Sequence, residues 1–210
     1  MGGLHMTFSC PVLTTDRLIL RPFTTADFGA IFEIFSDETV NTYLPWFPIR
    51  TIEEAQLLYK ARYAHFDGLR YAICLKKNDL PIGYVHVETA PSFDLGYGSK
   101  KKFWRRGIVS EACRATIRQA KACGVPYLTA THDRNNPHSG FVMRALGMRY
   151  CYSYEEMWQP KSFPVIFRLY QLDLDAPHAD YPDYRARYEN HFVEYELRHN
   201  DDLHFSQLLI

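Results

Sequence analysis

The segment of this chain with the clearest chemical potential is residues 93–112, whose sequence is FDLGYGSKKKFWRRGIVSEA. Its pattern predicts a strand, a basic loop and then a helix that begins at Gly107. A helix N-terminus presents unpaired N–H groups and the positive end of the helix dipole, so it binds anions. A glycine there allows a positive φ and a close approach of the backbone to a ligand. The segment therefore predicts a phosphate site, with a solvated basic turn as the alternative. Five cations in seven positions would favour anions there: Lys100, Lys101, Lys102, Arg105 and Arg106.

A second group of polar residues follows the next predicted strand. Asn136 precedes Pro137 and is expected to begin a helix, so its side chain is a helix-cap candidate even without a ligand. Ser139 lies in the first turn of the same helix. His132 lies in the strand itself, on a face with apolar residues, which favours a buried, hydrogen-bonded histidine over a catalytic one.

The elements that position these residues alternate between the strand and helix periods. Strands are expected at 17–23, 70–77, 81–89, 93–99, 127–133, 149–158 and 163–172. Helices are expected after Thr24, from Thr51 to Gly68, from Gly107 to about Cys123, and at 137–146. The order is therefore β-α-α-β-β-β-α-β-α-β-β, which predicts an α/β (α+β) domain with a mixed sheet.

The predicted domain spans residues 13–174, between an N-terminal extension at 1–12 and a C-terminal extension at 175–210. The C-terminal extension is rich in Tyr, His and Asp and has aromatic residues at helical spacing. We expect a helical appendage that caps the domain or contacts a partner. The aromatic residues at that spacing are Tyr184, Tyr188, Phe192 and Tyr195.

The composition excludes several classes of protein. The chain has 24 Lys and Arg against 24 Asp and Glu, and zero net charge argues against a nucleic-acid-binding protein. No apolar run approaches the roughly 18 residues of a membrane helix, and no signal peptide is recognised, so we expect a cytoplasmic protein. The five cysteines form no CxxC motif and are expected to be reduced thiols. No pair of histidines has ligand spacing on a predicted helix, so we expect no metal site.

Several segments together resemble the GNAT acetyltransferases of the RimJ/RimL-like branch. The family's acetyl-CoA signature is Gln/Arg-x-x-Gly-x-Gly/Ala, often with Trp first; here residues 104–109 are WRRGIV, with Val109 in the place of Gly or Ala. The required donor at that place is a backbone N–H, which valine has. The other matching segments follow the family's order and are LGY at 95–97, NPHS at 136–139, LGM at 146–148 and TDRLILRP at 15–22.

This resemblance implies a GNAT-like fold and an N-acetyltransferase that uses acetyl-CoA as co-substrate. The acetyl group would pass to a primary amine, of a protein N-terminus or a small molecule, by direct attack in a ternary complex. The backbone of residues 105–110 would hold the pyrophosphate, and the strand 95–99 would pair with the pantetheine arm and polarise the thioester carbonyl. Asn136 would bond to the pantetheine, and Ser139 would protonate the departing thiolate. The residues expected to bind the co-substrate are Tyr97, Gly98, Ser99, Arg105, Arg106, Gly107, Ile108, Val109, Ser110, Asn136 and Ser139.

The general base is less clear from the resemblance. Asp94 stands where some family members have Glu, and Glu155 and Glu156 stand where the RimL-like branch can place a base. Glu88 and His86 share one face of the preceding strand. An acidic residue on a half-exposed strand is usually only solvated, so ordered water is an alternative base. We take Asp94, Glu155 and Ser139 as the catalytic candidates.

Other functions remain open at this stage. A GNAT-like module could bind acyl-CoA without turnover or regulate a partner, because a fold alone does not establish activity. Residues 100–106 could instead bind nucleic acid, which the zero net charge disfavours. A covalent route through a cysteine and a histidine is disfavoured because Cys113 and Cys123 lie on the apolar stripe of a helix. We expect no nucleic-acid or membrane partner and leave a homodimer open.

Overall fold

The computed structural model describes residues 8–198. Residues 1–7 of the expected N-terminal extension and 199–210 of the C-terminal extension lie outside that range. The chain divides into two compact units, residues 1–125 and 126–210. The predicted order of the main elements is confirmed. Short elements that the pattern did not predict are β1 (Leu13–Thr14), α2 (Glu38–Asn41) and β9 (His191–Phe192).

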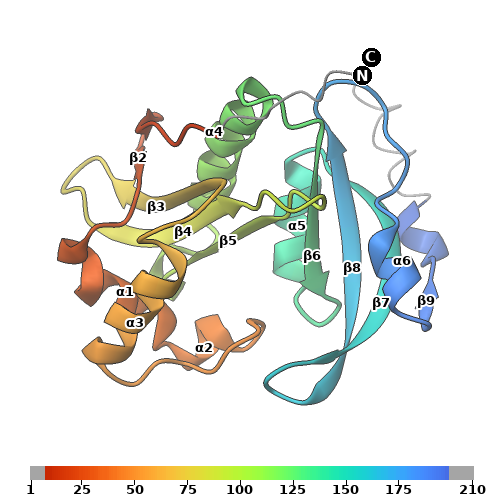
Figure 1. Cartoon of the computed structure of the whole chain (residues 1–210), viewed down its shortest axis with the longest axis horizontal. Helices are drawn as coiled ribbons and strands as arrows, with labels where there is room; N and C mark the ends of the chain where they lie inside the picture. The colour runs from red at the N-terminus through yellow and green to blue at the C-terminus, as the bar shows by residue number, and fades with distance from the viewer. Residues whose placement is uncertain (1–7, 199–210) are drawn as a thin grey trace. The chain divides into compact units, whose positions relative to one another are not determined.

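The first unit is built on an antiparallel sheet with the strand order β1-β2-β3-β4-β5 (Figure 1). Strand β4 is buried at every position except His86, because helices cover both faces of the sheet. Strand β5 is the last strand of this sheet, so only one of its edges is used in pairing within the described sheet. The strands after β1 are β2 (Leu18–Arg21), β3 (Leu69–Leu75), β4 (Pro81–Val87) and β5 (Leu95–Ser99).

Three helices cover the sheet of the first unit. Helices α1 (Phe28–Phe35) and α3 (Ile52–Arg62) lie on one face, and α4 (Ile108–Ala122) lies on the other (Figure 1). The backbone N–H and the hydroxyl of Thr24 donate to the Asp27 carboxylate at 2.8 and 3.0 Å, as part of a capping box before α1. Burial of an aliphatic or aromatic side chain stabilises a fold by about 1.5–3 kcal/mol. The buried side chains on the α1 and α3 side include Ile31, Ile34, Phe35, Ala55, Ala72, Cys74 and Tyr84.

Two features of this unit differ from the sequence prediction. Helix α3 ends at Arg62 instead of continuing to Gly68, because Tyr63 leaves the helical conformation, at φ −124°, where its ring enters the core. Phe66 therefore lies outside the helix. The short helix α2, which was not predicted, forms because the Asp37 carboxylate accepts two backbone N–H groups of its first turn.

The second unit is an antiparallel sheet with the strand order β6-β8-β7-β9. Strands β6 (Tyr127–Asp133), β7 (Arg149–Trp158) and β8 (Phe163–Asp173) lie where the sequence predicted them. Helix α5 (Pro137–Ala145) lies between β6 and β7 in the chain and begins at the predicted proline. Gly147, at φ +85°, follows the helix in the left-handed conformation that favours glycine.

Within the second unit, residues 175–198 of the C-terminal extension include α6 (Asp183–Arg187) and β9, which pairs with β7. The Tyr154 ring on β7 stacks against the rings of Tyr184 and Tyr188, with centroids 4.8 and 5.0 Å away. The predicted helical spacing therefore places Tyr184 and Tyr188 on the same side, against Tyr154. Phe192, in contrast, lies in β9, which pairs with β7. Two residues after β9, the Glu194 carboxylate accepts hydrogen bonds from the Arg168 guanidinium.

Candidate functional site

The predicted phosphate site lies at the N-terminus of α4. Gly107 precedes the helix at φ +69°, the left-handed conformation that its identity predicts. The first backbone bond runs from Glu111 N–H to the Gly107 carbonyl, at 3.0 Å, so the three N–H groups before Glu111 have no acceptor within the helix. They belong to the predicted residues Ile108, Val109 and Ser110. The helix start therefore offers the donors that an anion requires.

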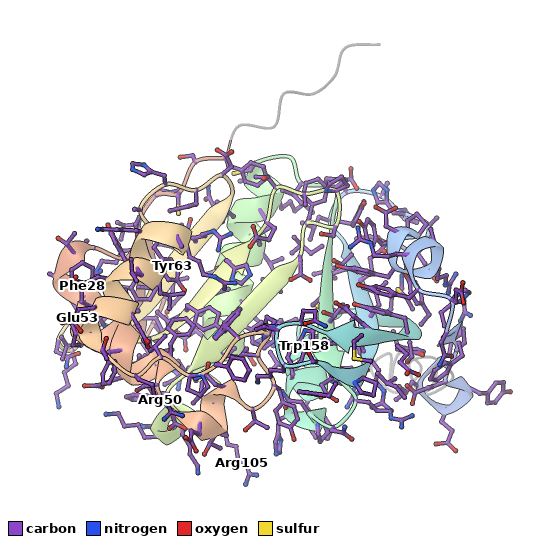
Figure 2. All side chains as sticks on the ribbon, turned by 60° about the horizontal axis from the view of Figure 1, so that its bottom comes forward. Phe28, Arg50, Glu53, Tyr63, Arg105 and Trp158 are labelled. Carbon is purple, nitrogen blue, oxygen red and sulfur yellow. The ribbon has the colours of Figure 1, made fainter. Side chains whose placement is uncertain are left out.

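The basic loop before Gly107 contains cations in two different situations. Lys100 donates to the Glu33 carboxylate at 2.7 Å, and its side chain is only 13% exposed. This lysine therefore has a structural contact, which joins α1 to the residue after β5. The remaining cations, at 101, 102, 105 and 106, are exposed, and Figure 2 shows Arg105 at the periphery of the molecule. Trp104 closes the loop, because its indole N–H donates to the Ser99 carbonyl at 2.9 Å.

An open cavity of about 830 Å³ flanks this end of α4 within the first unit. Gly107 and Ser110 of the predicted site line it. Four cationic side chains and two acidic ones also line it, and this excess of positive charge favours an anionic ligand. The charged residues are Arg17, Lys76, Arg114, Arg118, Asp16 and Glu111.

Strand β5 brings two glycines against aromatic rings of β4. Gly96 pairs with His86, and Gly98 pairs with Tyr84. A Cβ on Gly96 would lie 2.2 Å from the His86 ring, and one on Gly98 would lie 2.8 Å from the Tyr84 ring. Both positions therefore require glycine for cross-strand space, a constraint that the sequence alone did not reveal.

The remaining predicted residues of β5 alternate with these glycines. Tyr97 is half-buried and Ser99 is buried, and both face the opposite side of the sheet from the two glycines. The Ser99 hydroxyl has no hydrogen-bond partner among the described residues. Because β5 is the edge of its sheet, its second edge presents backbone donors and acceptors with which an extended ligand can pair.

Asp94 lies directly before β5, and its carboxylate is not the solvated group that an acid on a strand usually is. Its Oδ1 atom is buried and makes no hydrogen bond to any described residue. Burial, and to a smaller extent the nearby Glu88 carboxylate, raises the pKa of Asp94 to about 7. A carboxyl group with a pKa near neutrality can accept a proton at physiological pH and release it again.

Glu88 and His86, the other candidates in this unit, are occupied differently. One guanidinium nitrogen of Arg70 donates to both Glu88 oxygens, at 2.6 and 2.7 Å. His86 Nε2 lies 3.6 Å from Glu88 Oε1. Burial, and then the charges of Arg70 and Arg62, lowers the pKa of His86 to about 3, so the ring is neutral and this contact is no ion pair. Among these side chains, Asp94 is the carboxylate with an unpaired oxygen.

Asn136 and Ser139 lie together at the start of α5 in the second unit. Asn136 occupies the N-cap position, but its side chain makes no capping hydrogen bond, so the interpretation of Asn136 as a side-chain cap is wrong. Its backbone carbonyl instead accepts from the Ser139 N–H at 3.2 Å. The side-chain amide of Asn136 is therefore not used to start the helix, and Ser139 is half-buried in the first turn.

His132, on β6, is buried but not fully hydrogen-bonded. Its Nδ1 atom lies 2.8 Å from the Asp133 carbonyl, whereas Nε2 has no hydrogen-bond partner among the described residues. Burial lowers the pKa of His132 to about 4, so the ring is neutral. Gly140 of α5 packs on this ring, and a Cβ there would lie 2.7 Å from Nε2. Only one of the two ring nitrogens of His132 therefore has the hydrogen bond that the sequence analysis expected.

Glu155 on β7 is held by the C-terminal extension. Its backbone N–H donates to the Asn190 carbonyl at 2.9 Å, and the Asn190 side chain donates to Glu155 Oε2 at 2.6 Å. The second acid, Glu156, follows it on the opposite face of the strand. No sequence signal indicates that Asn190, 35 residues away, is the partner of Glu155.

Within residues 8–198, no group of three or more His, Cys, Asp or Glu residues is arranged to hold a metal ion. All five cysteines are free, and burial raises the pKa of Cys74 and Cys151 to about 12, which keeps both thiols protonated. No helix in the described range is long and apolar enough to cross a membrane.

Comparison with known sequences identifies the family. The acetyltransferase (GNAT) domain family matches residues 17–149, which is more than half of the chain. The chain is also 28% identical over 147 residues to YoaA of Bacillus subtilis, described as an uncharacterized N-acetyltransferase; the match covers 66% of this chain and 83% of YoaA.

Solved structures with low sequence identity share the fold. One is a candidate ribosomal-protein-serine acetyltransferase from Vibrio cholerae, at 19% identity and a TM-score of 0.63, covering 77% of this chain and 97% of that one. Another is yncA of Salmonella typhimurium, solved with its cofactor acetyl-CoA, at 17% identity and a TM-score of 0.59, covering 78% and 98%. These likenesses confirm the predicted mixed α/β GNAT fold. With the family match over residues 17–149, the chain belongs to the GNAT acetyltransferase family and is an N-acetyltransferase that uses acetyl-CoA.

Proposed function

We propose that this enzyme transfers the acetyl group to a primary amine by direct attack within a ternary complex, and that it belongs to the RimJ/RimL-like branch. The observation that carries the proposal is the start of α4, where Gly107 at φ +69° precedes three N–H groups without an acceptor in the helix. Those groups, with the exposed Arg105 and Arg106 beside them, suit the pyrophosphate of acetyl-CoA. The five free cysteines agree with the cytoplasm, which we propose as its compartment.

The edge of β5 would align the acyl donor. An extended pantetheine arm can pair with the backbone of residues 97–99, because that edge of the strand is not used within its own sheet. A backbone N–H directed at the thioester oxygen would stabilise the negative charge that develops there during attack. The side-chain amide of Asn136, which does not cap α5, would bond to the same arm.

Asp94 would act as the general base. The neutral amine attacks the carbonyl carbon, a C–N bond forms, the C–S bond breaks, and the surplus amine proton passes to the carboxylate. The unpaired Oδ1 atom and the pKa of about 7 support Asp94 over Glu155, whose carboxylate is held by Asn190. The departing thiolate would take a proton from the Ser139 hydroxyl, which becomes protonated again from solvent.

The acceptor would be an amine of low basicity. An α-amino group has a reference pKa near about 8 and a lysine near about 10.4, so an α-amine is already partly neutral at pH 7. A base with a pKa of about 7 removes a proton from the first class far more easily. The name of the Vibrio cholerae relative points to a protein acceptor for that enzyme. We therefore propose α-amines of peptides ahead of lysine side chains.

Binding and turnover test the proposal in sequence. Thermal unfolding is measured with acetyl-CoA, desulfo-CoA and ADP; a ligand at 100 times its Kd stabilises by about 2.7 kcal/mol. Release of the CoA thiol is then followed with a panel of peptide α-amines, small amines and lysine peptides. Stabilisation with turnover of α-amines supports the proposal. Stabilisation without turnover of any amine would indicate a module that binds acyl-CoA without catalysis.

Replacement of the base separates catalysis from binding. Asp94→Asn should lower kcat strongly while the KM for acetyl-CoA stays near that of the wild type. Asp67→Asn changes an exposed carboxylate of the same unit and is the matched control. If Asp94→Asn retains the wild-type kcat, ordered water or another group is the base.

A further inference from the structure

The turn between β1 and β2 is tied to the first turn of α4 through the Glu111 carboxylate. The Thr15 hydroxyl donates to Glu111 Oε1 at 2.5 Å, and the Arg17 backbone N–H donates to the same oxygen at 3.1 Å. The Arg17 Nε–H donates to the second oxygen, Oε2, at 2.6 Å. Both oxygens of the Glu111 carboxylate thus accept hydrogen bonds from this turn, and the bond to Oε2 orients the guanidinium of Arg17.

That orientation directs Arg17 onto the backbone of the basic loop. Its Nη1–H group donates to the Arg106 carbonyl at 3.0 Å. The Arg106 carbonyl and the Gly107 N–H belong to one planar trans peptide, in which they point in opposite directions. Holding the carbonyl therefore fixes the direction of the Gly107 N–H. A glycine at φ +69° otherwise leaves this peptide unusually free to rotate.

Charge balance supports the same role. Glu111 places a negative charge in the first turn of α4, close to the predicted anion site. Although burial alone raises it, the hydrogen bonds from Thr15 and Arg17 hold the pKa of Glu111 below its usual range, so the carboxylate is ionised. Its charge is neutralised by Arg17, at 2.6 Å, and does not oppose an incoming phosphate.

We propose that Arg17, held by Glu111, is a positioning residue that fixes the Gly107 peptide for the pyrophosphate of acetyl-CoA. The inference rests on the proposed site at the start of α4. It concerns the orientation of the loop before the ligand arrives, and a preorganised donor loses less freedom on binding. Arg17 acts through the backbone and need not touch the reacting atoms.

The test compares ligands with and without the pyrophosphate. Calorimetry gives the Kd of CoA and of pantetheine, which lacks the whole ADP portion, for the wild type and for Arg17→Gln. We expect the variant to bind CoA about tenfold more weakly, the effect of one lost charge-assisted hydrogen bond. Its affinity for pantetheine should change less than about twofold, because pantetheine does not reach the Gly107 peptide.

Two further variants separate positioning from charge and from stability. Arg17→Lys keeps the charge but cannot contact Glu111 and the Arg106 carbonyl together, so it should show most of the loss. Arg21→Gln changes the last residue of β2, the strand that follows Arg17, and breaks a less exposed pair, with Asp27 at 2.8 Å; it should lower Tm and leave the Kd of CoA unchanged.

The outcomes distinguish this inference from the function on which it rests. If the wild type binds CoA no better than pantetheine, the proposed pyrophosphate site is wrong, and the inference fails with it. If the wild type prefers CoA while Arg17→Gln only lowers Tm, Arg17 is structural, and the inference alone is overturned. Full restoration of CoA affinity by Arg17→Lys would also overturn it, because charge rather than orientation would then be sufficient.

Discussion

The buried carboxyl group of Asp94 should make the folded protein less stable as the pH rises, and Asp94→Asn should remove that effect. The pKa of Asp94 is about 7 in the folded state, against a reference value of 3.8. A carboxyl group whose pKa is higher in the folded state than in the unfolded state binds its proton more tightly in the folded state. It therefore favours folding while it is protonated, and this contribution is lost when it ionises at higher pH. Stability is therefore lost between about pH 4 and pH 7 as the carboxyl group ionises in its buried position.

The size of the effect follows from the shift in pKa. Each unit corresponds to about 1.4 kcal/mol, so a shift of roughly three units sets an upper value near 4 kcal/mol. The Asp94 residue as a whole is half-buried, although its Oδ1 atom is buried, so we expect about 2–4 kcal/mol above pH 7. The asparagine variant should be more stable than the wild type by that amount near pH 8 and nearly equal to it near about pH 4.

Urea unfolding of both proteins at a series of pH values measures this difference. The quantity of interest is the free energy of unfolding of the variant minus that of the wild type, which cancels the titration of all other groups. Asp67→Asn, in which an exposed carboxylate is changed, should give a flat difference across the same range. A flat difference for Asp94→Asn too would refute the reasoning, since the carboxyl group would then titrate alike in the folded and unfolded chains.

Three other perturbations have defined outcomes. Gly107→Ala and Gly124→Ala place alanine at φ +69° and +80° at the two ends of α4, and both positions have room for a Cβ. Both variants should lower the free energy of unfolding by about 1–2 kcal/mol, but only Gly107→Ala should weaken CoA binding in calorimetry. Glu88→Gln removes a carboxylate that raises the pKa of Asp94, so the acid limb of the pH–rate profile should move to lower pH; movement to higher pH would contradict the assignment. Glu194→Ala leaves a half-buried guanidinium unpaired and should destabilise by about 1–3 kcal/mol in urea, whereas Glu38→Ala, in an exposed pair, should stay within about 0.5 kcal/mol.

The order of elements was predictable because its signals are local. Strands β6 and β7 have breakers on both sides, and Gly124 and Gly147 end the preceding helices in the left-handed conformation. The helix start at Gly107, on which the proposed anion site rests, was predictable for the same reason, since a basic loop, one glycine and an apolar-striped helix are neighbours in the chain. Side-chain direction follows from strand alternation, which also places Glu88 and His86 on one face.

The partners of the site residues were not predictable, because they come from distant parts of the chain. Arg17 contacts the Arg106 carbonyl across 89 residues, and no composition or period signals that pairing. The end of α3 was misplaced because the burial of Tyr63 is a tertiary effect that overrides the apolar spacing through Phe66. The pKa of Asp94 likewise depends on what surrounds it, and the sequence gives only its position before a strand.

The pairing of β9 with β7 has a consequence for how this enzyme is handled in solution. An exposed strand edge is a template for another chain, and proteins protect such edges by covering them. Residues His191 and Phe192 cover part of the β7 edge, opposite Tyr154 and Ser153. A chain shortened at Leu174, where the predicted domain ends, would leave that edge bare and expose the tyrosine beneath α6. Such a chain should associate with itself as its concentration rises. The paired residues of the extension would thus protect the enzyme from aggregation.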